Sequence, residues 1–197
     1  MKTKFLGKTN NKSKKKGKNL LDNIPRTKED IKHGFDIWNV YDFMYLDKNM
    51  IPHLSVLEIT IPSNSDFIIE SKSMKLYLNH FYNKSFKTTS EISKIVKKDI
   101  EYKINSKIKV KFIKSFYKEP TVININKLKL KSSPIKKVLK FNGFRSICPV
   151  TSQPDFAIIY IYTNAKIDLK WLKIFLRSFK EKGEFHEQCI EDIFVSI

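Results

Sequence analysis

The chain has 197 residues, and its 41% of hydrophobic residues can bury a core as one domain or as two small ones. Its formal net charge of +18 would suit a partner rich in phosphates, but lysine is spread along the whole length and arginine occurs only at Arg26, Arg145 and Arg177. This indicates a general compositional bias, so we expect no direct binding to nucleic acid. No stretch approaches the ~20 apolar residues of a membrane span.

Residues 1–33 are expected to form a basic, partly disordered N-terminal arm. The one dense basic run in the chain is Lys12 to Lys18. A run of this kind is usually a solvated segment, and a nucleic-acid-binding tail is the alternative.

Residues 34–131 are expected to form a first module of strand, helix, helix and strand. The two strands are predicted by residues that alternate with polar or smaller ones, namely Leu57, Ile59 and Ile61, then Ile108, Val110 and Phe112. The two helices are predicted by apolar residues at helical spacing, namely Met74, Leu78 and Phe81, then Ile92, Ile95, Val96 and Ile100. Thr88 and Glu91 are placed as a capping box for the second helix.

Residues 132–197 are expected to form a second module that begins in the same way. The continuous apolar run from Ala157 to Tyr162 predicts a central strand. Asp168 is the predicted N-cap of a helix with Leu169, Leu172, Leu176 and Phe179 on one face. A last helix carries Ile190, Ile193, Phe194 and Ile197.

An internal repeat connects the two modules. Residues 75–81 align with residues 173–179 at most positions, which gives a period of 98 residues. In the first module a strand follows the second helix, whereas no such strand follows the last helix of the second module. We therefore expect the second module to be incomplete at its C-terminal end, with an open sheet edge that favours association.

The two cysteines have different surroundings. Cys189 lies in an apolar helical stretch, where a thiol is usually a small core residue. Cys148 lies in a loop-like segment, with Pro149 after it and Asp155 seven positions on. Two cysteines without a signal-like segment fit a reducing compartment, so a disulfide is not expected and the predicted location is the cytoplasm. The four histidines stand apart without ligand spacing, so no metal site is predicted.

Three motifs carry the potential chemistry: Ile69 to Leu76, Arg145 to Asp155, and Glu184 to Cys189. They supply a thiol, a nearby carboxylate and a His-Glu pair, which together can attack a weak electrophile and move protons during the attack. With residues 35–38, and in this order, they resemble the NADPH-dependent 7-cyano-7-deazaguanine reductases, the nitrile reductases of queuosine biosynthesis for tRNA modification. The likeness covers most of the chain and is closest to the two-module branch.

The resemblance implies an α+β fold of tandem tunnelling-fold modules, with antiparallel sheets backed by helices. Such modules associate through their sheets, so a homo-oligomer such as a dimer is expected. The resemblance also implies a closing strand pair after the last helix that brings an Arg-Gly pair to the phosphates of NADPH, and no residue of this sequence matches that pair.

The resemblance also assigns roles to residues. Cys148 would be the nucleophile that forms a thioimidate, and Asp155 the base that takes the thiol proton and then the acid. Glu187 would anchor the deazaguanine edge with support from His186. The other roles fall on the first module, where Ile69, Glu70 and Ser71 would line the substrate, and Ser71 and Lys72 would contact NADPH.

Structural alternatives exist for these residues. Glu70 and Ser71 can serve as the N-cap region of the Met74 helix, and His186 and Glu187 as the first turn of the last helix. Asp155 after Pro154 can be a turn residue. We expect Trp38 and Tyr41 to be aromatic core residues.

Three functions follow, from different classes. The first is the NADPH-dependent nitrile reductase. The second is a remnant that binds the deazaguanine without reducing it, which the absent Arg-Gly segment favours. The third is a basic nucleic-acid-binding protein, which only the N-terminal arm favours.

Overall fold

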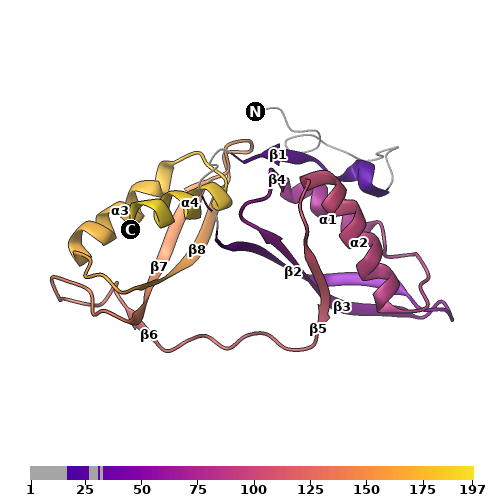
Figure 1. Cartoon of the computed structure of the whole chain (residues 1–197), viewed down its shortest axis with the longest axis horizontal. Helices are drawn as coiled ribbons and strands as arrows, with labels where there is room; N and C mark the ends of the chain where they lie inside the picture. The colour runs from indigo at the N-terminus through magenta and orange to yellow at the C-terminus, as the bar shows by residue number, and fades with distance from the viewer. Residues whose placement is uncertain (1–16, 27–30, 32) are drawn as a thin grey trace. The chain divides into compact units, whose positions relative to one another are not determined.

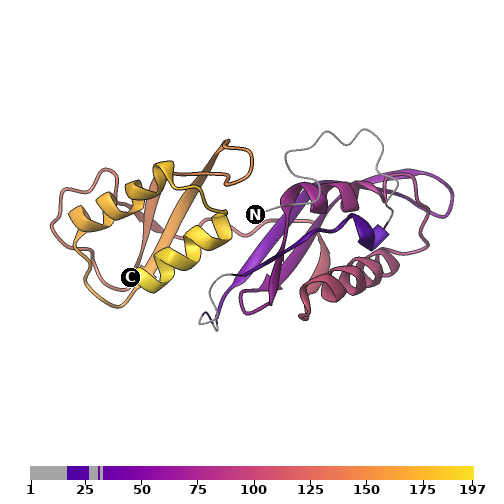
Figure 2. The same cartoon turned by 90° about the horizontal axis from the view of Figure 1, so that it is seen from above.

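The computed structural model describes residues 17–26, 31 and 33–197, and the chain folds into two compact units (Figures 1 and 2). The first unit extends to Phe116 and the second runs from Tyr117 to Ile197. Each is a sheet with helices packed on one face, so the fold is α+β as predicted. The division falls earlier in the chain than the predicted module boundary at residue 131.

The first unit contains a three-stranded antiparallel sheet in the order β2, β3, β5. These strands are β2 (Phe35–Leu46), β3 (Pro52–Pro62) and β5 (Lys109–Ile113). The predicted alternation is confirmed, because Leu57, Ile59 and Ile61 in β3 are each at most 1% exposed. Val110 in β5 pairs with Ile59 in β3 and packs against the same core.

Part of the predicted N-terminal arm belongs to this unit. A short 3-10 turn, η1 (Gly17–Leu20), and strand β1 (Asn23–Pro25) precede the main sheet, and β1 pairs antiparallel with β4 (Phe67–Ile69). Leu20, Leu21 and Ile24 are buried, so this part of the arm is held by apolar contacts that the basic composition of the arm concealed. The run from Lys12 lies largely outside the described residues.

Two helices, α1 (Ser71–Asn79) and α2 (Thr89–Ile104), cover one face of this sheet (Figure 1). The predicted N-cap of α2 is confirmed by the bond that the Glu91 backbone N–H donates to Thr88 Oγ1, at 3.3 Å. The Glu91 carboxylate accepts from the N–H of Lys87. Ile95 departs from expectation: it is 41% exposed, because at a helical period of 3.6 residues it lies beside the buried stripe of Ile92 and Val96.

Tyr41 is another correction, since it was expected in the core and is 64% exposed. The pairing of β2 with β3 shifts register between Val40 and Phe43. Val40 packs against the core and Phe43 is buried within it, so the two intervening residues, Tyr41 and Asp42, form a bulge, and the side chain of Tyr41 is left outside the packed interior. Trp38, in contrast, does pack partly against the core.

The second unit contains the strand order β6, β7, β8. These strands are β6 (Val122–Asn124), β7 (Lys137–Ile147) and β8 (Pro154–Thr163). β7 and β8 form an antiparallel hairpin, but β6 pairs parallel to β7, which the expectation of purely antiparallel sheets did not include. Because β6 belongs to this sheet, the second unit begins before residue 132.

Strand β8 lies at the edge of this sheet, within the described residues, and not in its centre as the apolar run predicted. Ile159 and Ile161 face the core, at 7% exposed each. The alternate residues of the run face outward and are 42% to 68% exposed, namely Phe156, Ile158, Tyr160 and Tyr162. An apolar run alone does not distinguish a central strand from an edge strand that carries aromatic residues on its outer face.

Helices α3 (Leu169–Ser178) and α4 (His186–Ser196), joined through η2 (Phe179–Glu181), cover the core face of β7 and β8 (Figure 2). The predicted face of α3 is confirmed, since Leu169, Leu172 and Leu176 are at most 1% exposed. On α4, Ile193 is buried but Phe194 is 64% exposed. Among the described residues, no helix combines the length and apolar character that a membrane crossing requires.

The internal repeat is confirmed by the helices. α1 begins at Ser71 and α3 begins at Leu169, and each is preceded by an acidic N-cap residue, Glu70 or Asp168. The Asp168 carboxylate accepts the N–H groups of Lys170 and Trp171 at 2.7 and 2.9 Å. The two units therefore share an acidic N-cap at the start of the corresponding helix.

Replacing Asp168 with alanine should destabilise the second unit by about 1 kcal/mol, because two N–H groups of α3 lose their acceptor. Trp171 lies in the same helical turn, so its fluorescence during urea unfolding should report the loss as a lower midpoint. Lys170→Ala is the matched control, since it changes an exposed residue of that turn and leaves the cap intact. Equal midpoints for the two variants would contradict the capping role.

Candidate active site

Cys148 and Asp155 lie at the turn end of the β7–β8 hairpin. Cys148 directly follows β7, and its backbone N–H donates to the carbonyl oxygen of Gln153 at 2.8 Å. Ser152 closes the turn by donating its N–H to the carbonyl oxygen of Cys148, at 3.0 Å, with a positive φ of 58°. The turn is thus fixed by backbone hydrogen bonds on both sides of the thiol.

The strand register places the two side chains on one face of the hairpin. Ser146 is opposite Asp155, and Ile147 is opposite Pro154. Because side chains alternate along a strand, Cys148 projects on the same face as Ser146, and therefore on the same face as Asp155. Cys148 and Asp155 are diagonal neighbours across the hairpin, a relation that puts Cβ atoms roughly 7–8 Å apart and within reach of one another through a small molecule or a water.

The start of α4 lies against the same end of the hairpin. The N–H of Ile147 donates to the carbonyl oxygen of Lys182 at 3.0 Å, and Ile147 forms an isolated bridge with Gly183. His186 opens α4, with its ring centroid 6.2 Å from that of Phe144 in β7. The Nε2 atom of His186 is buried and has no hydrogen-bond partner among the described residues. A buried imidazole nitrogen without a partner is suited to a bound molecule, because leaving it unpaired is costly.

Glu187 stands next to His186 in the first turn of α4 and is half-buried. The N-cap residue of α4, Phe185, makes no side-chain capping bond, so a negative charge at Glu187 is favoured by the helix dipole. Glu187 can therefore act as a first-turn residue that stabilises α4, and its role as substrate anchor stays a prediction.

The expected difference between the two cysteines is confirmed in part by their environment. Cys189 is 1% exposed, and burial raises the pKa of its thiol, which lies beside the hydroxyl of Ser146. A thiol with a raised pKa is a poor nucleophile. Cys148 is half-buried, and both cysteines are free thiols. Only Cys148 combines partial exposure with a neighbouring carboxylate.

Glu70 is the N-cap of α1 and is 2% exposed. Its Oε1 and Oε2 atoms accept the backbone N–H groups of Lys72 and Ser73 at 2.7 and 2.8 Å. Ile69, the last residue of β4, is also buried. The capping alternative thus describes Glu70 in this unit, and its Oε1 atom also accepts from the hydroxyl of Ser71 at 3.5 Å.

Ser71 and Lys72 are the residues that were expected to contact NADPH, so their side chains are considered as ligands of its phosphates. Ser71 is exposed and Lys72 is half-buried, so the first turn of α1 carries a hydroxyl and an ammonium. The helix N-terminus itself is already occupied by the carboxylate of Glu70, which satisfies the N–H groups that usually bind phosphate. A phosphate would therefore depend on side-chain cations, and Lys72 fits that need.

The structure brings Cys148, Asp155, His186 and Glu187 to one end of the β7–β8 hairpin in the second unit. Ile69, Glu70, Ser71 and Lys72 are grouped separately at the start of α1 in the first unit. Each group is contiguous within its own unit.

Lys182 is a residue of this region that the sequence analysis missed. Its ammonium contacts the carboxylates of Glu184 and Asp192 at 3.0 and 2.7 Å. These contacts hold the segment before α4 against that helix, which begins at His186. The acidic residues on both sides of Lys182 in the sequence suggest an ion pair. The partner Asp192 could not be predicted in this way, because a separation of ten residues matches no regular helix or strand spacing.

Comparison with known proteins agrees with the motifs. Residues 13–112 match the family model described as nitrile reductase, 7-cyano-7-deazaguanine-reductase N-terminal. Residues 154–197 match the model described as QueF-like protein. The first match covers about half of the chain and the second covers the strand and helices that carry Asp155, His186 and Glu187.

Relatives named NADPH-dependent 7-cyano-7-deazaguanine reductase occur in several bacteria. The protein of Coxiella burnetii (strain Dugway 5J108-111) is 34% identical over 84% of this chain and 66% of its own length. That of Buchnera aphidicola subsp. Schizaphis graminum is 35% identical over 83% of this chain and 71% of its own length. That of Desulfotalea psychrophila is 33% identical, over 93% and 72%.

The chain spans about two thirds of the length of the relatives that it matches. The first match contains the motif Ile69 to Leu76 and the second contains Glu184 to Cys189, whereas most of Arg145 to Asp155 lies between the two matches. The chain therefore belongs to the 7-cyano-7-deazaguanine reductase family of nitrile reductases.

Proposed function

We propose that this protein reduces the nitrile of 7-cyano-7-deazaguanine to the primary amine with two molecules of NADPH, a step of queuosine biosynthesis. The observation that carries the proposal is the placement of Cys148 and Asp155 on one face of the hairpin, beside the start of α4. The names of its relatives supply the substrate and the cofactor.

The covalent step follows from the chemistry of a nitrile, whose carbon is a weak electrophile. The thiolate of Cys148 adds to that carbon and forms a C–S bond, while one C–N π bond breaks and the nitrogen takes a proton. A free thiol has a pKa of ~8.5 and is mostly protonated near neutral pH. Asp155 takes the thiol proton during attack and returns it to the nitrogen, which leaves a neutral thioimidate.

NADPH, when bound, supplies a hydride in each of two successive reductions. The first hydride would add to the thioimidate carbon, and Cys148 would leave as a thiolate that takes up one proton, which gives the imine. The second hydride would add to the imine carbon, and the second proton to the nitrogen, which gives the amine. The overall change uses two hydrides and two protons for each nitrile. The Nε2 atom of His186 is buried without a hydrogen-bond partner among the described residues, which supports a role in holding or passing a proton at the reacting nitrogen.

Glu187 anchors the substrate, because a carboxylate can accept two adjacent N–H donors from the deazaguanine edge. Glu187→Ala should weaken substrate binding about tenfold to a hundredfold, as expected for charge-assisted bonds. Isothermal titration with the Cys148→Ala background would measure binding without reaction. Glu181→Ala, which removes an exposed carboxylate of the same unit, is the control. Unchanged affinity in Glu187→Ala would leave this residue with only its helix-dipole role.

The first test of the function is intact-protein mass spectrometry after mixing with 7-cyano-7-deazaguanine, followed by addition of NADPH and measurement of its absorbance. We expect an adduct with the mass of the nitrile that disappears as NADPH is consumed. An adduct that persists without NADPH consumption would favour a protein that binds the deazaguanine but does not reduce it. Absence of any adduct would contradict the proposal.

We further propose that the protein acts in the cytoplasm as a homodimer and does not bind nucleic acid directly. Free thiols at both cysteines support a reducing location. The edge strand β8, with exposed apolar residues such as Phe156 and Tyr162, supports association of subunits. Analytical ultracentrifugation tests the dimer. Measurement of RNA binding at low and at high salt tests the last point, since no binding is expected at either.

A further inference from the structure

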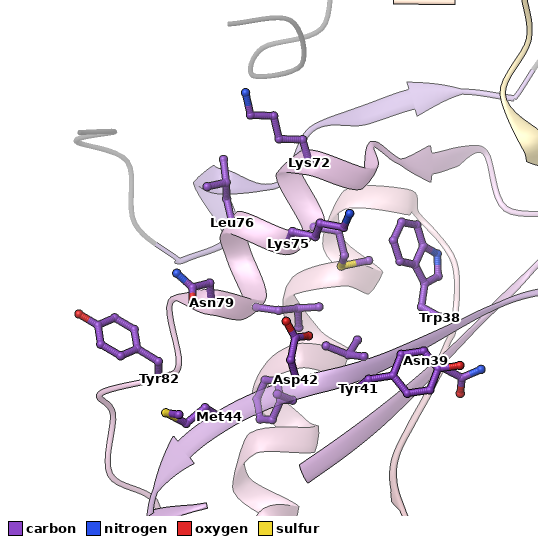
Figure 3. A pocket seen from close by; sticks show the side chains of 14 residues that line it. Trp38, Asn39, Tyr41, Asp42, Met44, Lys72, Lys75, Leu76, Asn79 and Tyr82 are labelled. Carbon is purple, nitrogen blue, oxygen red and sulfur yellow. The ribbon is translucent and has the colours of Figure 1, made fainter. Parts of the chain in front are cut away.

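Figure 3 shows a hollow of about 500 Å³ between strand β2 and helix α1 of the first unit. Lys72, which is already expected to contact NADPH, is one of its lining residues, and no residue at the turn end of the β7–β8 hairpin lines it. The hairpin instead carries a buried polar group of its own. This group is the hydroxyl of Ser146, to which the proposed reaction assigns no role.

Ser146 lies in β7, two residues before Cys148, and is fully buried. Its Oγ atom has no hydrogen-bond partner among the described residues. A buried hydroxyl without a partner lowers stability, because it has lost its bonds to water and gained none in return. Alanine would fill nearly the same space without that cost, so the hydroxyl itself requires an explanation.

The strand register puts Ser146 directly opposite Asp155, on the face of the hairpin that the helices cover. Directly opposite residues have Cβ atoms about 4.5–5.5 Å apart. Both side chains are short, so rotation about their χ1 bonds brings the hydroxyl and the carboxylate within hydrogen-bond distance. In the described part of the chain, the Asp155 carboxylate takes part in no ion pair or hydrogen bond that would fix it elsewhere.

Two other groups lie near the Ser146 hydroxyl. The thiol of Cys189 is beside it, and burial raises the pKa of that thiol, so it keeps its proton and is a weak acceptor. The ring of His186 packs on Phe144, which is two residues before Ser146 in β7. A carboxylate is the strongest acceptor of the three, because a bond to an ionised group is charge-assisted. The hydroxyl proton is therefore best placed on Asp155.

We propose that Ser146 is a positioning residue for Asp155. Its hydroxyl donates to one carboxylate oxygen and leaves the other directed at the thiol of Cys148. The proposal rests on the proposed function, in which Asp155 takes the thiol proton. A donated hydrogen bond also favours the ionised form of a carboxylate, so the base stays ready to accept a proton at lower pH.

The test measures the rate of adduct formation with 7-cyano-7-deazaguanine from pH about 4 to about 8, by intact-protein mass spectrometry. Ser146→Ala should form the adduct about tenfold more slowly or worse, as for a lost charge-assisted bond. The loss should increase as the pH falls, because a carboxylate without its donor is neutralised earlier. It should stay smaller than the loss in Asp155→Asn, since the base itself is kept.

Ser133→Ala is the matched control, because it removes another buried hydroxyl of the second unit. The Oγ atom of Ser133 accepts the N–H of Ile167 at 2.9 Å, just before α3. This variant should lose stability, yet its rate relative to the parent protein should not change with pH. A pH-independent loss in Ser146→Ala would likewise show a purely structural role and refute the proposal.

Two backgrounds identify the group through which Ser146 acts. Ser146→Ala should have little further effect in Asp155→Asn and its full effect in Cys189→Ala. The opposite result would show that the hydroxyl serves the buried thiol, and would overturn the proposal. A parent rate in Ser146→Ala would refute this inference and leave the proposed function standing. Absence of an adduct in the parent protein would contradict the proposed function itself and, with it, this role of Ser146.

Discussion

Cys148→Ala is expected to abolish the covalent adduct with 7-cyano-7-deazaguanine completely while the fold is kept. The residue follows β7 in a turn held by backbone hydrogen bonds, and these do not involve its side chain. Removing a half-buried sulfur from this turn should cost little stability. Intact-protein mass spectrometry should therefore show the unmodified mass only, and NADPH consumption should fall to the background rate.

The matched control for this variant is Cys189→Ala, which also removes one thiol. Cys189 is buried in the core and its thiol has a raised pKa, so adduct formation should continue without it. The adduct should map to the peptide that contains Cys148. An adduct that survives in Cys148→Ala, or that is lost only in Cys189→Ala, would refute the assignment of the nucleophile.

Asp155→Asn is expected to slow adduct formation about 10²- to 10⁴-fold, the usual contribution of a positioned general base. The amide keeps the size of the carboxylate in β8 but cannot take the thiol proton. A thiol that lacks a base beside it reacts faster as the pH rises, because the thiolate is the nucleophile. The rate of the variant should therefore increase steeply with pH, and the gap to the parent protein should narrow.

Stopped-flow or quenched mass measurements across pH 6 to about 9 would determine both rates. Asp192→Asn offers a comparison within the same unit, because that carboxylate pairs with Lys182 and is not expected to transfer protons. Its effect should be smaller and nearly independent of pH. Near-normal rates in Asp155→Asn would show that another group takes the thiol proton. A rate difference from the parent protein that stays constant with pH would show the same.

Local sequence patterns predicted most of the fold. Alternation in Leu57 to Ile61, helical spacing in α1 and α3, and the capping residues Thr88 and Asp168 all depend on neighbours within a few positions. Errors arose where a pattern had two structural explanations. The apolar run of β8 fits a central strand or an edge strand, and Tyr41 fits a core only while the strand keeps its register.

The candidate site follows the same division. The sequence motifs by themselves identified the family and the residue types, since the thiol, the acid and the His-Glu pair are recognisable in order along the chain. Which faces they share was decided by the tertiary structure. The register of β7 with β8 puts Cys148 and Asp155 on one face, and the bridge from Ile147 to Gly183 brings α4 beside them.

By itself, the sequence determined the helices, their caps, the repeat and the family, because these depend on residue type and short spacing. Only the tertiary structure decided the parallel strand β6 and the ion pairs of Lys182. Both depend on how whole elements pack against each other, because β6 pairs with the later strand β7 and Lys182 lies outside α4 while Asp192 lies within it.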